Sequence, residues 1–267
     1  MWQKNCYRIV VKVGTSTITH DTGAMDIHSM EKLVRVLADL KGYGHEIILV
    51  TSGAIAVGAA KMTPGKRPKE LRMKQAAAAV GQCQLMHMYD KLFGEYNQTV
   101  AQILLTDEDV ADKSRSEHLS GTFSALLETG VIPVVNENDS VSSAEIETGA
   151  HKVLGDNDTL SAIVVKLCNA DMLVLMSDID GLYDSDPHTN KDAKLIHKVE
   201  NLDADIDKMA GGAGTKRGTG GMVTKITAAR IATEAGCDMI IMNGAKPEKL
   251  YDVVEGKEVG TRFVGKK

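Results

Sequence analysis

Six short apolar runs, rich in β-branched residues, are spaced along the whole chain and predict strands. Each run is continuous in apolarity, which is typical of strands covered on both faces rather than on one. Helical periodicity separates the runs, with one apolar face between Ile27 and Leu40 and a second between Ile226 and Ala232, just before Gly236. The predicted strands are residues 9–13, 47–51, 100–105, 131–135, 172–176 and 239–242.

This alternation of strands and helices predicts an α/β fold with a mainly parallel sheet and helices on both sides. Ligands of such sheets bind at the carboxyl ends of the strands. Small, polar or acidic residues follow four of the predicted strands, and although any one group would suit an ordinary turn, four at one edge favour a site. These groups are Gly14-Thr15-Ser16, Ser52-Gly53-Ala54, Asn136-Glu137-Asn138-Asp139 and Ser177-Asp178.

Composition narrows the classes of function. The 267 residues carry 31 Lys and Arg against 36 Asp and Glu, a net charge of -5, so no basic field is present to hold a nucleic acid. The four cysteines lack CxxC spacing and are interpreted as reduced, mostly core-packing thiols. No signal-peptide pattern and no run of about eighteen apolar residues is found, so we expect a cytoplasmic protein without a membrane partner.

Lys12 lies inside the first apolar run and is directly followed by Val13 and Gly14. A lysine in a buried strand is costly unless its ammonium group reaches an anion, and the glycine lets backbone amides approach a phosphate closely. Lys12 is therefore a candidate phosphate ligand. The alternative is an edge-strand lysine whose ammonium group extends to water.

A glycine-rich stretch, residues 218–221, runs directly into the helical pattern that contains Lys225. A helix start offers unpaired N–H groups and the positive end of the helix dipole, and Lys225 would add a full charge there. The spacing differs from the GxxxxGK[ST] pattern of a P-loop. The segment is thus either an anion-binding helix start or a flexible loop with an incidental lysine.

Three polar residues, Asp156, Asn157 and Asp158, stand at the head of another apolar helical pattern. One of them, Asp156 or Asn157, would cap the helix, which leaves the others unexplained. We predict that Asp158 lies between the two lysines and orients them. The acidic stretch that begins with Ser177 and Asp178 would lie near Mg²⁺ or a nucleotide, although its Asp-Gly and Asp-Pro pairs are also ordinary turn dipeptides.

Taken together, these segments resemble the amino acid kinase family, and within it the members that phosphorylate glutamate. The resemblance spans essentially the whole chain, and VTSGAI, NEND and GTGGM-x-TK are its most specific parts. It rests on VKVGTS (residues 11–16), VTSGAIAVG (50–58), KQAAAAVGQ (74–82), PVVNENDSV (133–141), GDNDTLSA (155–162), SDIDGLYDSDP (177–187) and GTGGMVTKI (218–226).

The resemblance implies a three-layer αβα sandwich that uses ATP and Mg²⁺ to convert L-glutamate to γ-glutamyl phosphate, the first step toward proline. It implies catalytic roles for Lys12, Asp158 and Lys225, and glutamate binding by Ser52, Gly53, Ala54, Asp139 and Asn157. No protein residue is predicted to be a dedicated metal ligand. The implied nucleotide-binding residues are Lys12, Gly14, Ser177, Asp178, Thr219, Gly220, Gly221, Met222, Val223, Thr224 and Lys225.

The resemblance also implies a homo-oligomer, dimer or tetramer, and feedback inhibition by proline. We expect a single kinase domain over residues 1–267, with an acceptor-binding part to about residue 155 and a nucleotide-binding part from about residue 156. Two features depart from the family pattern. Residues 147–154 make a connection about six residues longer than expected, and no PUA domain is expected because the chain ends soon after residue 263.

Three other functions were considered. A kinase of the same fold could act on another acceptor, namely N-acetylglutamate, aspartate, carbamate or a nucleoside monophosphate, although VTSGAI and NEND favour free glutamate. A non-catalytic amino-acid sensor is disfavoured because Lys12, Asp158 and Lys225 are all present. An NAD-dependent oxidoreductase is excluded, since no GxGxxG follows the first predicted strand.

Overall fold

The computed structural model describes residues 6–66, 68–141, 156–187, 189–211 and 221–266. All six predicted strands are present, and two short strands near the carboxyl end, which the apolar pattern did not indicate, complete one sheet. The six are β1 (Arg8–Val13), β2 (Glu46–Val50), β3 (Val100–Leu105), β4 (Ile132–Glu137), β5 (Met172–Ser177) and β7 (Asp238–Asn243), and the two additional strands are β6 (Lys198–Val199) and β8 (Thr261–Phe263).

The eight strands follow the order β3-β4-β2-β1-β5-β7-β8-β6. The first six of this order are parallel, whereas β8 is antiparallel to β7 and β6 is parallel to β8. Strand β1 lies at the centre, with β2 on one side and β5 on the other, so strands from both parts of the sequence share one sheet. In β1, Lys12 lies opposite Val50 of β2 and Leu175 of β5.

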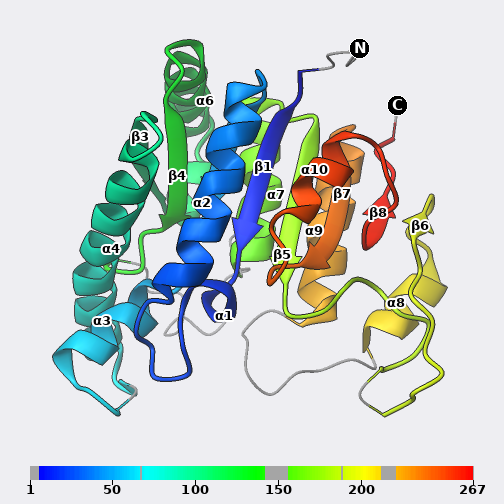
Figure 1. Ribbon diagram of the computed structural model, residues 1–267, viewed down its shortest axis with the longest axis horizontal. Coiled ribbons are helices and arrows are strands. Elements are labelled where there is room, and N and C mark those ends of the chain that lie inside the picture. Colours follow the sequence, from blue (N-terminus) through cyan, green and yellow to red (C-terminus); the bar gives the residue numbers. More distant parts are fainter. Residues whose placement is uncertain (1–5, 67, 142–155, 188, 212–220, 267) are drawn as a thin grey trace.

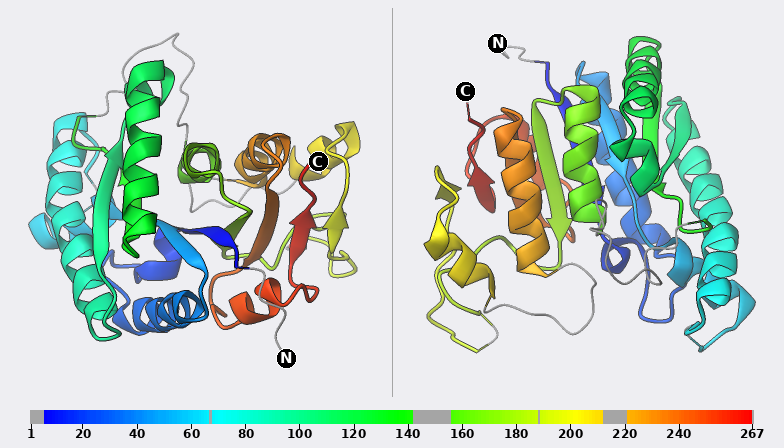
Figure 2. Two further views of the ribbon diagram at one scale, coloured as in Figure 1. Left: turned by 90° about the horizontal axis from the view of Figure 1, so that it is seen from above. Right: turned by 180° about the vertical axis from the view of Figure 1, so that it is seen from behind.

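Helices cover both faces of this sheet, which confirms the predicted αβα sandwich (Figures 1 and 2). One face carries α2 (Ile27–Gly42), α4 (Leu71–Gly94) and α10 (Lys249–Val254), and the other carries α6 (Lys113–Glu128), α7 (Asn157–Cys168) and α9 (Met222–Glu234). Three short helices follow the carboxyl ends of β1, β2 and β3, namely α1 (Thr15–Ile18), α3 (Ala54–Met62) and α5 (Asp107–Ala111). A further short helix, α8 (Ala204–Gly211), lies beside α9.

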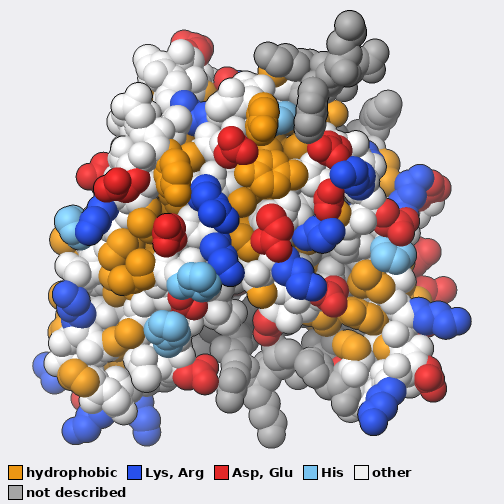
Figure 3. All heavy atoms as spheres, in the orientation of Figure 1, with side chains coloured by type: hydrophobic (Ala, Val, Ile, Leu, Met, Phe, Trp, Pro, Cys, Tyr) orange, Lys and Arg blue, Asp and Glu red, His pale blue; other side chains and the backbone are white. Residues whose placement is uncertain are grey.

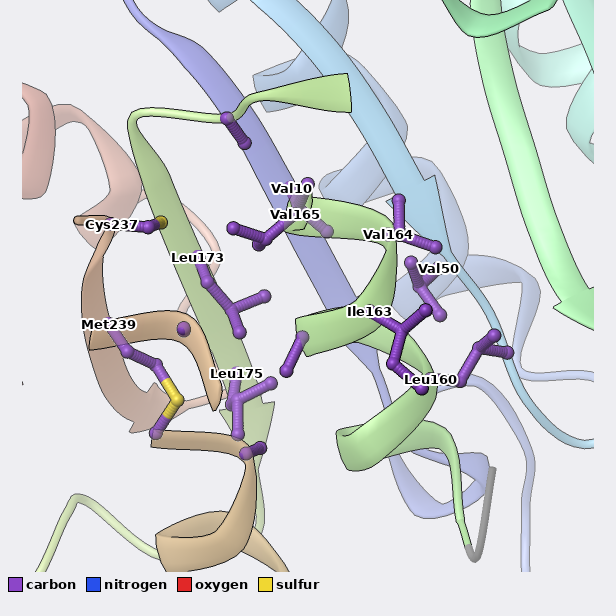
Figure 4. Packing of buried hydrophobic residues seen from close by; sticks show 14 of the residues in the cluster. Val10, Val50, Leu160, Ile163, Val164, Val165, Leu173, Leu175, Cys237 and Met239 are labelled. Atoms are coloured by element: carbon purple, nitrogen blue, oxygen red, sulfur yellow. The ribbon is translucent and has the colours of Figure 1, made fainter. Parts of the chain in front are cut away.

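The alternation of side chains along β1 determines which layer each residue meets. Val11 and Val13 pack in the core beneath α2, whereas Val10 packs in the core beneath α7. Because side chains two residues apart point to the same face of a strand, Lys12 is directed toward the α7 side. Figure 4 shows that side, where Ile163 and Val164 of α7 lie over the strands that carry Val10 and Leu173. Burial of each such side chain contributes roughly 1.5–3 kcal/mol.

Helix α2 buries the predicted face with one exception. Met30, Leu33, Leu37 and other members of the face are inaccessible, but Ile27 is 54% exposed. Ile27 is the first residue of the helix, directly after the Asp26 cap, and it lies before the turn that packs on the sheet. Its assignment to the buried face was therefore wrong. Helix α9 buries Ile226, Ala229 and Ala232 as predicted, whereas Ile231, the fourth residue of the predicted face, is only partly buried.

Two glycines allow α3 and α4 to cross in direct backbone contact. A Cβ atom at Gly58 of α3 would lie 1.8 Å from the carbonyl oxygen of Ala77, and one at Gly81 of α4 would lie 1.8 Å from the carbonyl oxygen of Ala54. Neither position therefore tolerates a side chain without separation of the helices. Since α3 begins at Ala54, this crossing also fixes the start of α3, directly after Ser52 and Gly53.

The four cysteines differ in burial. Cys168 and Cys237 are packed in the core, whereas Cys6 and Cys83 are exposed, so the core interpretation is correct for only two of them. Burial raises the pKa of the Cys168 thiol to about 12 and also raises the pKa of Cys237. Both buried thiols thus remain protonated and unreactive in the folded protein.

We expect a thiol reagent at pH 8 to modify two cysteines rapidly and the other two only after unfolding. Mass spectrometry of the partly labelled protein should locate the fast labels at Cys6 and Cys83. Addition of guanidinium chloride should then allow the reagent to modify Cys168 and Cys237. Rapid labelling of either buried residue in the native protein would contradict the packing described here.

Acidic and basic side chains are interspersed over the face formed by α2, α4 and α10 (Figure 3). That face therefore carries no extended field of a single sign. Within the described ranges, no helix combines the length and apolarity required to cross a membrane.

Candidate active site

Two lysines from distant parts of the sequence meet at one carboxylate. Lys12 Nζ lies 2.6 Å from Asp158 Oδ1, and Lys225 Nζ lies 3.0 Å from Asp158 Oδ2. The side chain of Asp158 is 1% exposed, and those of Lys12 and Lys225 are 11% and 8% exposed. The structure therefore brings together the three residues that the sequence singled out as a charged set.

Local structure explains why these side chains converge. Asp158 is the second residue of α7, and the carboxylate of Asp156 caps this helix by accepting hydrogen bonds from the amides of Asp158 and Thr159. Lys225 is the fourth residue of α9, and the preceding Thr224 donates its hydroxyl hydrogen bond to Asp158 at 3.0 Å. Helices α7 and α9 pack side by side, α7 over the strand that carries Lys12 and α9 over β7.

The electrostatics keep Asp158 ionised. Burial by itself raises the pKa of this carboxyl, but the two adjacent ammonium groups of Lys12 and Lys225 outweigh burial and hold the pKa below its ordinary value. For Asp156 burial predominates and raises the pKa, with a further contribution from the negative charge of Asp158. Lys12 and Lys225 thus bring two ammonium groups to the carboxyl edge of β1, an arrangement that suits an anionic ligand.

Replacement of Asp158 by asparagine should lower the stability of the protein by an amount that depends on pH. Because the folded pKa is depressed, the carboxylate stabilises the fold above the ordinary carboxyl range, and this contribution is lost as the pH falls from that range through the lower folded pKa. We expect Asp158→Asn to lower the free energy of unfolding by about 3 kcal/mol at pH 7, since a buried pair loses its partner. The difference from wild type should shrink below roughly pH 4.

Urea unfolding of both proteins between pH 3 and 8 measures this difference. The matched control is Asp90→Asn, which changes an exposed aspartate of α4. Its difference from wild type should stay small across the range. A difference for Asp158→Asn that does not change with pH would show that the charge of Asp158 is not the stabilising feature.

Two of the predicted phosphate-loop glycines leave open space in the protein. Among the residues that the structure describes, a Cβ atom at Gly14 would approach none closer than 3.9 Å, and one at Gly221 would have none within 4 Å. The fold itself therefore does not require glycine at either position, in contrast to Gly58 and Gly81. The open space at both loops, beside Lys12 and Lys225, fits a phosphate chain whose oxygens accept backbone hydrogen bonds.

The other predicted nucleotide residues divide into three groups. Ser177 ends β5 and donates to the adjacent Asp178, so both lie at the carboxyl edge of the sheet. Gly221 caps α9, whose first residues are the buried Met222 and the exposed Val223. Thr219, Gly220 and the longer connection at residues 147–154 lie outside the described residues.

The predicted acceptor residues gather on the other side of β1. Asn157 Nδ2 donates to Ser52 Oγ at 2.6 Å and to the backbone oxygen of Thr51 at 3.0 Å. Gly53 has φ of 91°, a left-handed conformation that glycine adopts at little cost, and it leads directly into α3 at Ala54. Ser52 and Asn157 therefore form one hydrogen-bonded pair, although they are far apart in the sequence.

A hollow of about 360 Å³ opens between α4, β3 and the segment that follows β4. Ala54 and Asp139 line it, as do Gln82 and Glu137. Two of the five predicted acceptor residues thus border a space of the size of a small molecule, whereas Ser52, Gly53 and Asn157 do not line it. Their role in binding remains a prediction.

Sequence reasoning missed a set of buried polar residues behind this site. Asn136 Nδ2 donates to Gln82 Oε1 at 2.9 Å, and its own Oδ1 accepts from Asn157 at 3.3 Å. The hydroxyls of Thr51 and Tyr89 lie 2.8 Å apart. Gln82 and Tyr89 belong to the long helix α4, which was not predicted as an element. A signal was present, because the two polar residues are seven positions apart and so lie on the same helix face.

Comparison with known proteins agrees with this geometry. The profile of the amino acid kinase family matches residues 7–243. In overall fold the chain is similar to a carbamate kinase from Giardia lamblia bound to AMP-PNP (TM-score 0.67, 15% identity, 98% of this chain and 99% of that chain covered). It is also similar to the UMP kinase of Bacillus anthracis (TM-score 0.66, 16% identity, 98% of each chain covered). At these identities the structures support the fold alone.

Curated relatives are much more similar in sequence. The glutamate 5-kinase of Clostridium perfringens is 52% identical over 264 residues, which cover 99% of this chain and 97% of that protein. The glutamate 5-kinase of Caldanaerobacter subterraneus is 52% identical over 257 residues, or 96% of this chain and 68% of that protein. The chain therefore belongs to the amino acid kinase family, a class of phosphotransferases. Within this family it groups with the glutamate 5-kinases.

Proposed function

We propose that the chain transfers the γ-phosphoryl group of ATP to the side-chain carboxylate of L-glutamate, giving γ-glutamyl 5-phosphate for proline biosynthesis. The observation that carries this proposal is the convergence of Lys12 and Lys225 on the buried Asp158, at the edge of the sheet where Ser52 and Asn157 also lie. Relatives that are half identical over nearly the whole chain are glutamate 5-kinases, which supports glutamate as the acceptor.

The proposed mechanism is a direct in-line attack of the glutamate carboxylate on the γ-phosphorus. The carboxylate is already ionised at neutral pH, so no general base is required. The protein must instead bring two anions together and stabilise the charge that spreads over the transferred group. Lys12 and Lys225 supply two positive charges for this purpose, and Asp158 keeps both ammonium groups in place.

In this proposal β1 separates two binding regions of one domain. Residues up to about 155 hold glutamate through Ser52, Gly53, Ala54 and Asp139, and Asn157 joins them from the start of the second part. Residues from about 156 hold the nucleotide through Ser177, Asp178 and the stretch from Thr219 to Lys225, together with Lys12 and Gly14. The division follows the sheet, since β2 and β4 lie on one side of β1 and β5 and β7 on the other.

Mg²⁺ is expected to enter with ATP. The described part of the chain contains no group of three or more His, Cys, Asp or Glu side chains that could hold a metal ion. In kinase sites Mg²⁺ is commonly held by phosphate oxygens, water and only one or two carboxylates. When bound, Mg²⁺ would neutralise charge on the phosphate oxygens.

Glutamate-dependent release of ADP, with hydroxylamine to trap the acyl phosphate, tests the proposed function. Hydroxamate should form with glutamate and not with N-acetylglutamate, aspartate or carbamate. Formation from one of the other acceptors would assign the chain a different substrate. Binding of glutamate without ADP release would instead favour an amino-acid sensor.

Assembly, regulation and location belong to the same proposal. We expect a cytoplasmic homo-oligomer, dimer or tetramer, that is subject to feedback inhibition by proline. Sedimentation analysis measures the assembly, and the rate at rising proline concentration measures the inhibition. A monomer, or a rate that does not depend on proline, would remove the respective expectation without affecting the assigned reaction.

A further inference from the structure

A buried tyrosine of α4 reaches the turn that joins β2 to α3. The hydroxyl of Tyr89 lies 2.8 Å from the hydroxyl of Thr51, and both side chains are 0% exposed. Burial raises the pKa of the Tyr89 phenol, so this group is protonated and available as a hydrogen-bond donor throughout the neutral range. Thr51 directly precedes Ser52 and Gly53, two of the predicted acceptor residues.

Thr51 is held from three directions. Its amide donates to the backbone oxygen of Val135 in the neighbouring β4 at 2.9 Å, and its backbone oxygen accepts from Asn157 at 3.0 Å. The contact with Tyr89 supplies the third direction, from the helix layer beneath the turn. A shift of Thr51 would therefore move Ser52 and release the side chain of Asn157.

The hydroxyl of Tyr89 is not needed for packing. Phe93 lies one turn further along α4, is equally inaccessible and fills the core with a ring that has no polar group. A hydroxyl in such surroundings is costly unless it is paired. Tyrosine at position 89 therefore points to a requirement for its hydrogen bond rather than for its volume.

Helix α4 makes a second polar contact of the same kind. Gln82 lies seven residues before Tyr89, on the same face of the helix, and accepts from Asn136 at the end of β4. Asn157 reaches both strand ends, through Thr51 and Ser52 directly after β2 and through Asn136 on β4. Helix α4 is thus connected to both strand ends that surround Asn157.

We propose that Tyr89 is a positioning residue for the acceptor, whose hydroxyl fixes Ser52 and Asn157 through Thr51. This inference rests on the proposed function, because it assigns Tyr89 to the glutamate side of the site. Lys12 and Lys225 are held separately by Asp158. Loss of the Tyr89 hydrogen bond should therefore affect glutamate and leave the nucleotide largely unaffected.

The test compares Tyr89→Phe, Thr51→Val and Thr51→Ser with the wild type in steady-state kinetics. We expect Tyr89→Phe and Thr51→Val each to raise KM for glutamate about tenfold, the size of one lost hydrogen bond in a buried site. KM for ATP should change less than about twofold by the same reasoning. Thr51→Ser retains a hydroxyl and should restore most of the affinity for glutamate.

The double variant Tyr89→Phe/Thr51→Val provides an internal check. If the two hydroxyls act through one bond, the double variant should lose no more than either single variant. The matched control is Tyr251→Phe, which removes another interhelical tyrosine hydrogen bond, from α10 to Asp39 of α2 at 2.8 Å. This control should leave both KM values unchanged.

A glutamate KM for Tyr89→Phe equal to that of wild type overturns the inference, as does an equal rise in both KM values. A fall in melting temperature with unchanged KM values likewise overturns it, since that result describes a stabilising residue only. Absence of glutamate turnover in the wild type would refute the proposed function instead. The two failures are therefore distinguishable in one set of measurements.

Discussion

Lys225→Ala should lower kcat about a thousandfold, and Lys12→Ala should do the same. Removal of one group that stabilises transition-state charge typically costs a factor of about 10²–10³, and the near-complete burial of these lysines places the effect at the upper end. The effect should appear chiefly in kcat, because the charge spreads most in the transition state. Single-turnover rates with saturating ATP and glutamate measure it directly.

Lys166→Ala is the control for the lysine variants. Lys166 lies in the last turn of α7, the helix that carries Asp158, but is exposed. Its replacement should leave kcat within about twofold, as expected for a surface charge remote from the site. Near-normal turnover of Lys12→Ala or Lys225→Ala would remove that lysine from the proposed chemistry.

Gly81→Ala should destabilise the protein by about 3 kcal/mol, the upper part of the range for overpacking. The added methyl group would overlap the carbonyl oxygen of Ala54, a backbone atom that cannot turn aside as a flexible side chain could. Helices α3 and α4 would have to separate, which breaks their close crossing. Urea unfolding followed by circular dichroism measures the change.

Gly121→Ala makes the same substitution within a helix, in α6, where an added Cβ would meet nothing within 4 Å. The free energy of unfolding of this variant should rise by about 0.5–1 kcal/mol, because alanine is the better helix former. If the free energy of unfolding falls for Gly81→Ala and rises for Gly121→Ala, the effect of close packing is separated from that of helix propensity. A stabilised Gly81→Ala would contradict the crossing of α3 and α4.

The sequence predicted the parts of the fold that depend on uninterrupted apolarity. Five of the six long strands are covered on both faces as expected, whereas the edge strand β3 buries only Ile103 and Leu105 and exposes Gln102. Helices α2 and α9 were recognised by their one-sided patterns. Strands β6 and β8 contain two and three residues, too few for any periodicity to register. Helix α4 was missed because its alanine-rich stretch and its glycine at position 81 conceal the apolar face.

The charged residues of the site could be predicted from the sequence, whereas the buried polar contacts behind it could not. A lysine in an apolar strand demands a counter-ion, so Lys12 and a carboxylate such as Asp158 could be paired from charge alone. The polar contacts of Thr51, Tyr89 and Gln82 could not be predicted in this way, because each residue type is ordinary in a core or a turn. Only the register of α4 against the strand ends shows that these residues meet.

The central position of β1 has a consequence for the making of the protein. Lys12 on the first strand carries one of the two ammonium groups, whereas Lys225, which carries the other, lies on α9 near the end of the sequence. A nascent polypeptide that has not yet reached α9 therefore lacks the second cation. Under the proposed function, only a chain synthesised through α9 can carry out phosphoryl transfer.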